Sequence, residues 1–306
     1  MKIRTTVYYI LTGLALLAMV GCSNYEGDQH IPAYLHIDSI ALANDPNDSW
    51  STEDGFFTHN IDAAEIVIWQ EGDTAEQVLG VFTLPCTVPI LKQGNVDRVR
   101  VSPCVPQSGI SGARIYYPYY QQVTINDVRF APDSITSLGT VTTHYKSHQA
   151  MSVKFQEFFE PWESTIRFKP ESVIHRISNQ SDTVRSGRGC GVVRMSADER
   201  RKSFTSVDSF YVSDPSAYIY LEMDVWSDFN FKVGFSNPTY RGGPVVDTSA
   251  YTRTAPSTGW EKYYIVLGRL WSWYSYYPYL KLWFAIYNDT GKEGKFLIDN
   301  VKVVVM

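Results

Sequence analysis

Alternating apolar and polar positions dominate the first half of the chain and predict strands rather than helices. The segments that show this period are residues 34–40, 64–69, 78–84, 96–101, 123–125 and 135–145. A period of two is typical of a strand that buries one face, and Glu71-Gly72-Asp73 suits the turn of a hairpin. About seven short strands without a helical period predict an immunoglobulin-like β-sandwich over residues 33–145.

A second set of alternating segments predicts another β-sandwich over residues 152–306. Its expected strands are 217–226, 231–235, 260–267, 280–287 and 296–303. The polar stretch 142–149 is interpreted as the linker, and Asn288-Asp289-Thr290-Gly291 is a turn signal before the last strand. The expected fold class is therefore all-β, with two β-sandwich domains, the second a jelly roll.

Residues 1–21 have the pattern of a signal peptide. Lys2 and Arg4 precede an apolar segment that ends at Val20 and is too short for a comfortable membrane span. The following Gly21-Cys22 resembles a bacterial lipoprotein signal. This resemblance implies that Cys22 is acylated, by palmitate or a similar chain, and that residues 22–32 tether the protein to the outer membrane. A secretory peptide with an incidental cysteine is the alternative.

The polar tether also loosely resembles the export signal of surface lipoproteins of Bacteroidota, which implies the cell surface. Three stretches of the first domain, 34–40, 80–91 and 109–120, resemble a lipoprotein group of the same bacteria.

Charge and histidine content restrict the function classes. The net charge of −5, without a basic block, argues against a nucleic-acid partner. Only His144 and His148 lie close together among the 6 histidines, and no G-x-S-x-G motif occurs. The chain is therefore predicted not to be an enzyme.

An aromatic run, 260–287, contains more rings than one core requires. Its flanks alternate as strands, but Pro278 interrupts its middle, which is expected to be a surface loop. The candidate contact residues there are Trp271, Trp273, Tyr274, Tyr276, Tyr277 and Tyr279. They could close the end of the sandwich, contact a partner protein, stack on a glycan or rest at a membrane interface.

A smaller candidate surface lies in the first domain. Arg114 stands close to Tyr117 and Tyr119, so this segment could bind a ligand through ring stacking and cation–π contact. The alternative is a loop that packs the rim of the sandwich.

Three cysteines follow Cys22. Cys86 and Cys104 flank a predicted strand pair, so a disulfide between them is one expectation and free thiols are the other. Cys190 would then remain a buried thiol. No Cys/His spacing resembles a zinc site.

The second domain resembles the galactose-binding-like jelly roll of carbohydrate-binding modules. The stretches that carry the resemblance are Phe158-Phe159-Glu160, Gly259-Trp260-Glu261-Lys262 and Ile298-Asp299-Asn300-Val301-Lys302-Val303. It implies a structural calcium ion held by Glu160 and Asp299, whose carboxylates would otherwise be ordinary surface groups. No other cofactor is expected.

Two functions follow from these resemblances. The layout, an immunoglobulin-like domain and a jelly roll on a lipid anchor, is similar to accessory surface lipoproteins of Bacteroidota envelope machines, including barrel assembly. It implies an accessory or scaffold subunit with an envelope protein partner. The alternative is a surface lipoprotein that binds glycans through the jelly roll.

Overall fold

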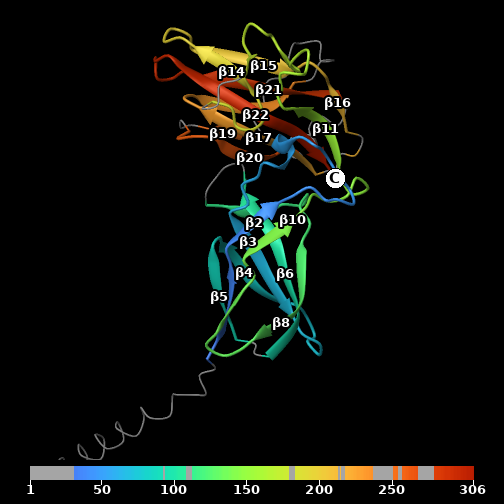
Figure 1. Cartoon of the computed structure of the whole chain (residues 1–306). Coiled ribbons are helices and arrows are strands. Elements are labelled where there is room, and N and C mark those ends of the chain that lie inside the picture. The colour runs from blue at the N-terminus through green and yellow to red at the C-terminus, as the bar shows by residue number, and fades with distance from the viewer. Residues whose placement is uncertain are drawn as a thin grey trace, which may run out of the picture.

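The computed structural model describes residues 31–91, 94–107, 112–178, 183–212, 214, 218–236, 251–253, 257–267 and 279–306. Their regular structure is strand, apart from the short 3-10 helix η1 (Asp54–Phe57). Strands β1–β10 pair among themselves and β11–β22 among themselves, and the two groups lie end to end (Figure 1). The predicted all-β fold of two sandwiches is confirmed. No helix of these residues has the length and apolarity to cross a bilayer.

The first domain contains three sheets. Their strands are β1 (Ala33–Ile37), β2 (Ser39–Leu42), β3 (Ala63–Trp69), β4 (Gln77–Thr83), β5 (Cys86–Ile90), β6 (Gly94–Pro106), β7 (Arg114–Tyr116), β8 (Val123–Phe130), β9 (Ile135–Ser137) and β10 (Thr140–Thr143). The sheet orders are β5-β1-β9, β10-β2 and β4-β3-β6-β7, with β8 also on β6. The first two strands of the domain pair in parallel with its last two, β1 with β9 and β2 with β10. The N-terminal and C-terminal segments of the domain are therefore hydrogen-bonded to each other.

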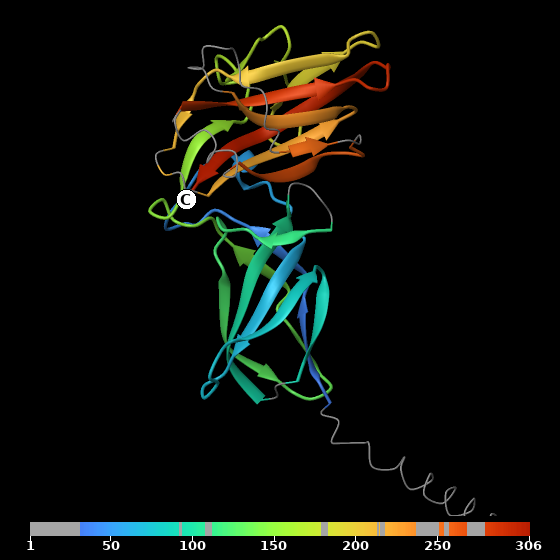
Figure 2. The same ribbon diagram turned by 180° about the vertical axis from the view of Figure 1, so that it is seen from behind.

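The second domain contains two large sheets. Their strands are β11 (Ser152–Glu157), β12 (Phe168–Lys169), β13 (His175–Ser178), β14 (Gly189–Met195), β15 (Arg201–Ser206), β16 (Phe210–Tyr211), β17 (Ile219–Ser227), β18 (Asn230–Ser236), β19 (Tyr251–Arg253), β20 (Glu261–Val266), β21 (Tyr279–Tyr287) and β22 (Gly294–Val305). One sheet has the order β13-β14-β22-β17-β20 with β11 on β22, and the other the order β12-β15-β21-β18-β19 with β16 on β21. Figure 2 shows the two sheets layered on one another above the first domain.

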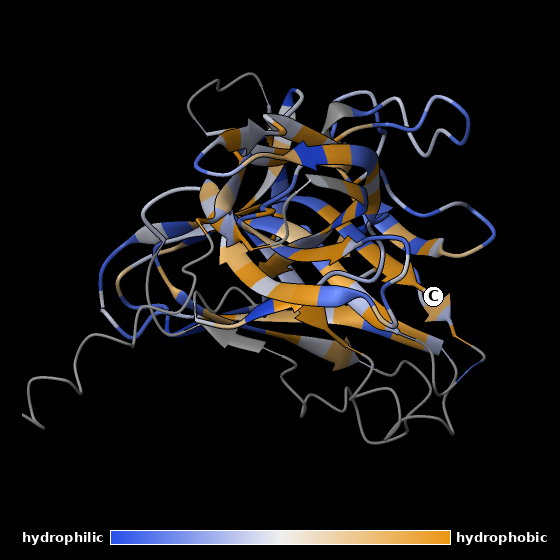
Figure 3. Cartoon of the chain, turned by 90° about the horizontal axis from the view of Figure 1, so that it is seen from below, coloured by the Kyte–Doolittle hydropathy of each residue, from blue (hydrophilic) through white to orange (hydrophobic). Residues whose placement is uncertain are grey.

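Period-two alternation explains the core of the second domain. Leu282, Phe284 and Ile286 of β21 point inward and are fully buried, and Phe204 stacks on Phe284 with 4.7 Å between ring centroids. Burying each such side chain contributes about 1.5–3 kcal/mol. Figure 3 shows hydrophobic residues along the strands and hydrophilic ones in the connecting loops.

The structure refines the predicted linker and settles the state of two cysteines. Thr142 and Thr143 of the predicted linker 142–149 belong to β10, and the segment that follows packs against the first domain, because Tyr145 is buried and Trp50 donates its indole N–H to the carbonyl of Lys146. Cys86 and Cys104 are free thiols, on strands β5 and β6 of two different sheets. The expected disulfide between them is therefore absent.

Candidate functional site

The tyrosines predicted to form a ligand surface in the first domain lie between the two domains. Tyr117 and Tyr119 are fully buried, and Tyr120 is buried with them. The ring of Tyr117 packs edge-on against Tyr220 and Tyr264 of the second domain, with centroids 5.2 and 4.8 Å apart. The prediction that Tyr117 and Tyr119 contact a partner or a glycan is therefore wrong, because the second domain covers them.

Arg114, the third residue of that predicted surface, is held within the first domain. Its Nη2 lies 2.7 Å from Oδ2 of Asp62, and both side chains are partly buried. The cation–π contacts found among the described residues do not include Arg114. We therefore assign Arg114 to an ion pair rather than to a ring-stacking site.

Charged side chains lie beneath the tyrosine rings and are removed from solvent. Glu222 and Asp224 stand on β17, Lys262 on β20 and Lys302 on β22, all buried. Nζ of Lys302 lies 3.1 Å from Oε2 of Glu222, and Nζ of Lys262 lies 3.4 Å from Oδ2 of Asp224. The Thr58 hydroxyl of the first domain donates to Asp224 at 2.7 Å. We call Glu222, Asp224, Lys262 and Lys302 the junction cluster; its two carboxylates balance its two ammonium groups.

Tyrosines of the first domain complete the hydrogen bonding of the junction cluster. The hydroxyls of Tyr117 and Tyr145 donate to Glu222 at 2.6 and 2.8 Å. Burial alone would raise the pKa of Glu222, but Lys302, Lys262 and these hydroxyls outweigh it and hold the pKa below its usual value. Burial also lowers the pKa of Lys302 to about 8. The junction is thus an internal contact built from both domains, not a ligand site.

The aromatic run divides between core strands and an exposed end. Its flanks form β20 and β21, and Tyr263 and Phe284 within them are buried in the core. Tyr279, the first residue of β21, is 52% exposed. The other predicted contact residues and the predicted lipidation site lie outside the described residues; they are Trp271, Trp273, Tyr274, Tyr276, Tyr277 and Cys22.

Beside Tyr279 lies an exposed ring that sequence reasoning missed. Tyr211 of β16 pairs in register with Tyr279, the ring centroids are 5.4 Å apart, and Tyr211 is 48% exposed. In this strand Phe210 faces the core and Tyr211 faces out. An alternation over just two residues is too short a signal to predict a strand from the sequence. The two tyrosines present adjacent aromatic faces at the edge of the second domain.

A pocket of about 300 Å³ opens next to Tyr211. We call it the linker pocket, because much of its wall comes from the segment that joins the domains. Its lining residues are His148, Gln149, Ala150, Met151, Ser152, Lys154, Tyr211, Val212, Asp214, Val305 and Met306. The His148 ring is fixed by a 2.5 Å hydrogen bond between Nδ1 and Asp48 and by stacking on Trp50 at 3.7 Å. The pocket thus combines an aromatic wall with several hydrogen-bonding groups.

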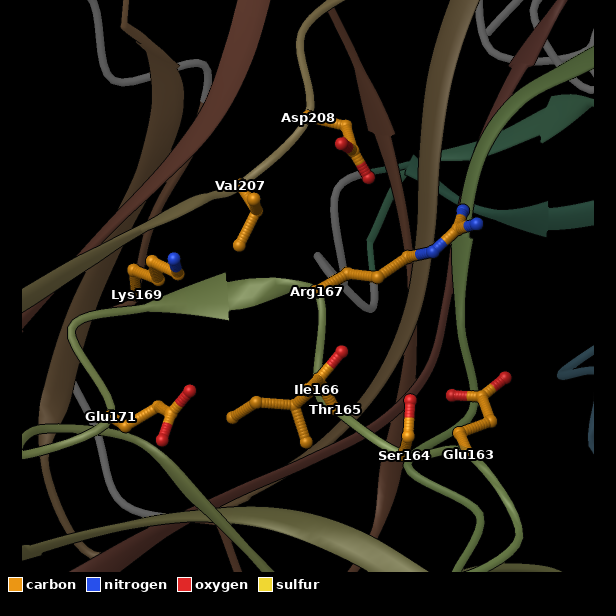
Figure 4. A pocket seen from close by; sticks show the side chains of 9 residues that line it. All are labelled: Glu163, Ser164, Thr165, Ile166, Arg167, Lys169, Glu171, Val207 and Asp208. Carbon is orange, nitrogen blue, oxygen red and sulfur yellow. The ribbon is translucent and has the colours of Figure 1, made fainter.

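A larger hollow of about 490 Å³ lies elsewhere on the second domain and is shown in Figure 4. Its polar lining alternates in charge, with Arg167 and Lys169 among the carboxylates of Glu163 and Glu171. Its lining includes no aromatic ring. Because it offers charge but no flat apolar face, it suits a sugar less well than the linker pocket does.

The backbone of Arg167, a lining residue of this hollow, is bonded to a carboxyl group with an unusual proton affinity. Glu157 is buried and accepts hydrogen bonds from the backbone N–H groups of Phe159 and Arg167. Burial, reinforced by the negative charge of Glu163, raises the pKa of Glu157 to about 7. The carboxyl therefore fixes the loop between β11 and β12 and titrates near neutral pH.

The predicted calcium residues occupy a crowded, oxygen-rich corner. Asp299 is fully buried and accepts hydrogen bonds from the backbone N–H groups of Asn300 and Ser186, at 2.8 and 3.4 Å. Burial, with the negative charges of Asp224 and Glu160, raises the pKa of Asp299 well above its usual value. A cation would relieve that repulsion, and the ion pairs found in the described residues give Asp299 no cationic partner.

A glycine loop closes over this corner. Gly187 has φ +63°, and a Cβ there would lie 1.6 Å from Oε1 of Glu160, so any other residue would strain the backbone and displace the Glu160 carboxylate. The carboxylates of Glu160 and Asp299, with the Asn300 amide oxygen, are hard donors that fit calcium. The described residues contain no group of three or more His, Cys, Asp or Glu side chains able to hold a metal. A calcium ion would therefore depend on backbone carbonyls and water for its remaining ligands.

Comparisons with known proteins found no matching family model and no curated relative. Among solved structures, the xylan-binding domain CBM22-1 of Paenibacillus barcinonensis Xyn10C matches with 13% identity and a TM-score of 0.36, over 50% of this chain and 94% of that one. The K1 cleaved adhesin domain of Lys-gingipain from Porphyromonas gingivalis W83 matches with 9% identity and a TM-score of 0.32, over 50% and 98%.

The enzymatically active domain of tailspike protein 4 of bacteriophage CBA120 matches with 12% identity and a TM-score of 0.33. The match covers 51% of this chain and 19% of the tailspike chain. At these identities and TM-scores the likenesses say nothing about the ligand of this protein.

Proposed function

We propose that the protein is a non-catalytic, lipid-anchored glycan-binding protein, and that the linker pocket is its sugar site. The observation that carries this proposal is the Tyr211–Tyr279 ring pair, 5.4 Å between centroids, together with the pocket of about 300 Å³ that Tyr211 lines with both apolar and hydrogen-bonding residues. Ligand pockets usually measure roughly 300–1,000 Å³. The linker pocket therefore suits a short piece of a glycan, whose neighbouring residues would lie across the exposed rings.

The chemistry of the lining fits a sugar. One face of a pyranose ring presents C–H groups, which pack against an aromatic face, while its hydroxyls need donors and acceptors around the edge. Tyr211 supplies the face, and Asp214, Lys154 and Gln149 supply acceptor and donor groups. His148, already held by Asp48, adds a ring whose orientation is set before the ligand arrives.

The anchoring part of the proposal rests on the N-terminal sequence. The basic start, short apolar segment and Gly21-Cys22 support acylation of Cys22, which would hold the domains at the outer membrane. Acyl chains contribute about 0.8 kcal/mol per buried methylene, so they anchor a protein without a transmembrane helix. With the tether exposed on the cell surface, the linker pocket would meet external glycans.

The accessory-subunit function has less support. It was expected to act through aromatic-rich surfaces, and the one at Tyr117 and Tyr119 is covered by the second domain. The edge at Tyr279 remains open to either kind of partner. Affinity purification from detergent-solubilised envelope separates the two functions, because a stoichiometric barrel partner is expected only for an accessory subunit.

A glycan array with the mature chain tests the sugar site. We expect binding to a restricted set of glycans, and a loss of about tenfold in affinity for Tyr211→Ala/Tyr279→Ala, which equals about 1.4 kcal/mol. Trp162→Ala is the matched control, because Trp162 is 59% exposed and does not line the linker pocket. An array without signal, or equal losses in both variants, would refute the assignment.

A further inference from the structure

Apolar side chains form a row across the outer face of the sheet β5-β1-β9. Tyr34 of β1 pairs with Pro89 of β5 on one side and with Ile135 of β9 on the other. Cross-strand partners point to the same face and lie about 5 Å apart. Leu91 follows the end of β5 on the same side, since its neighbour Ile90 faces the core.

This row is exposed and extends to the first residues of the domain. Leu91 is 68% exposed and Ile135 is 66% exposed. Ile31 is also exposed and stands two residues before β1. We call Ile31, Tyr34, Pro89, Leu91 and Ile135 the distal patch.

The charges around the distal patch are few and opposed. Asp133, whose N–H donates to the carbonyl of Pro32, and Arg129, whose carbonyl accepts from Thr136, are exposed beside it. Farther along the same face of β1, Asp38 is paired with His36 at 2.9 Å, so the described residues around the patch carry no block of like charge. The patch therefore suits an apolar or zwitterionic surface rather than a strongly charged one.

The distal patch lies where the chain enters the first domain. In Figures 1 and 2 the start of β1 is at the end of the molecule farthest from the second domain. Cys22 precedes Ile31 by nine residues, which span at most about 30 Å when fully extended. A lipid attached at Cys22 therefore keeps this end of the molecule within that distance of the bilayer.

We propose that the distal patch rests on the surface of the membrane that carries the lipid anchor. This inference depends on the acylation of Cys22 proposed above. Apolar side chains at such an interface lie about 5–10 Å into the boundary between headgroups and acyl chains, which exposed Leu91 and Ile135 can reach. The contact orients the molecule with its second domain, and thus the linker pocket, directed away from the bilayer.

The experiment uses the lipidated mature protein in phosphatidylcholine vesicles with brominated acyl chains, which quench tryptophan on contact. The probe is Leu91→Trp, and the matched control is Val81→Trp, because Val81 is a 49% exposed apolar residue on β4 of the same domain. Because the parent chain already contains 8 tryptophans, its fluorescence is subtracted from that of each variant to give the signal of the added tryptophan. We expect the added signal of Leu91→Trp to fall by roughly half at interfacial depth, and that of Val81→Trp to stay unchanged.

A second variant checks that the patch itself makes the contact. Adding Ile135→Glu to Leu91→Trp places a charge in the middle of the row, so the quenching should disappear. Equal quenching of Leu91→Trp and Val81→Trp, or none in either, overturns the inference while leaving the anchor intact. A chain without acyl mass on its N-terminal peptide overturns anchoring and docking together. A detergent-stable dimer that Ile135→Glu dissociates would assign the patch to a second copy and also overturn docking.

Discussion

Replacing Glu222 by Gln removes one charge from the junction cluster at almost constant volume. The Glu222 carboxylate lies 3.1 Å from Nζ of Lys302 and accepts the hydroxyls of Tyr117 and Tyr145. Lys262 keeps its ion pair with Asp224 at 3.4 Å. The variant therefore leaves one buried ammonium group, that of Lys302, without its carboxylate.

The cost of this change depends on pH because Lys302 can give up its proton. In the parent protein, burial lowers the pKa of Lys302 to about 8. In the variant, the folded state keeps Lys302 neutral, and deprotonating it at a pH below 8 costs about 1.4 kcal/mol for each pH unit below that value. The weaker hydrogen bonds of a neutral amide add about 1 kcal/mol at any pH. We expect Glu222→Gln to lower the free energy of unfolding by about 2 kcal/mol at pH 7.5, by about 4 at pH 6 and by about 1 at pH 9.5.

Urea unfolding of the mature chain at these three pH values, followed by tryptophan fluorescence, measures the penalty. Glu222→Gln/Lys302→Met removes both members of the ion pair, so the dependence of the penalty on pH should vanish. A penalty that stays constant from pH 6 to 9.5, or a double variant that keeps the slope, would refute the assignment of a charged Lys302 at the junction. A single unfolding transition is also expected, since side chains of the first domain hydrogen-bond to the cluster in the second.

Two further outcomes follow from buried carboxyl groups. The pKa of Glu157 is raised from 4.5 to about 7, so between these pH values the folded protein holds a proton that the unfolded chain has lost. The contribution of Glu157 to the free energy of unfolding is therefore fully present below pH 4.5 and is lost as the pH rises through 7. Thermal unfolding of Glu157→Gln from pH 5 to 8 should show a weaker loss than the parent, by up to about 3 kcal/mol; an unchanged profile would contradict the buried titration. Calcium added to chelator-treated protein should raise the Tm by about 5 °C at saturating concentration. Asp299→Asn should abolish that rise and the control Asp289→Asn keep it, while no rise in the parent would exclude the calcium site.

The core of both sandwiches could be predicted because alternation is a local property. Leu282, Phe284 and Ile286 repeat with a period of two, and this pattern places them on one face whatever surrounds the strand. The same period in β17 separates Leu221 and Met223, which face the core of the second domain, from Tyr220, Glu222 and Asp224 on the other face. Their burial could not be predicted, because it depends on the other domain.

The exposed ring of Tyr279 and the linker pocket also differ in whether the local sequence could indicate them. The exposed Tyr279 was predicted from a local excess of rings around a proline. The linker pocket was missed because its residues come from three separated segments, represented by His148, Tyr211 and Met306. Nothing in the spacing of these residues indicates that the fold brings them together.

The linker pocket and the junction cluster share one strand, which connects the proposed function to the packing of the domains. Lys302 anchors the middle of the junction on β22, while Val305 and Met306 at the end of the chain line the pocket. Residues four apart on a strand are about 13 Å apart, so a shift of β22 at the junction displaces the pocket wall. His148 and Lys154 approach from the linker side, which Tyr145 fixes through its hydrogen bond to Glu222. The geometry of the pocket therefore depends on how the two domains pack at the junction. An offset between them would remove the hydrogen bonds that Thr58, Tyr117 and Tyr145 donate to the buried carboxylates of Asp224 and Glu222, and leaving such groups unsatisfied is costly.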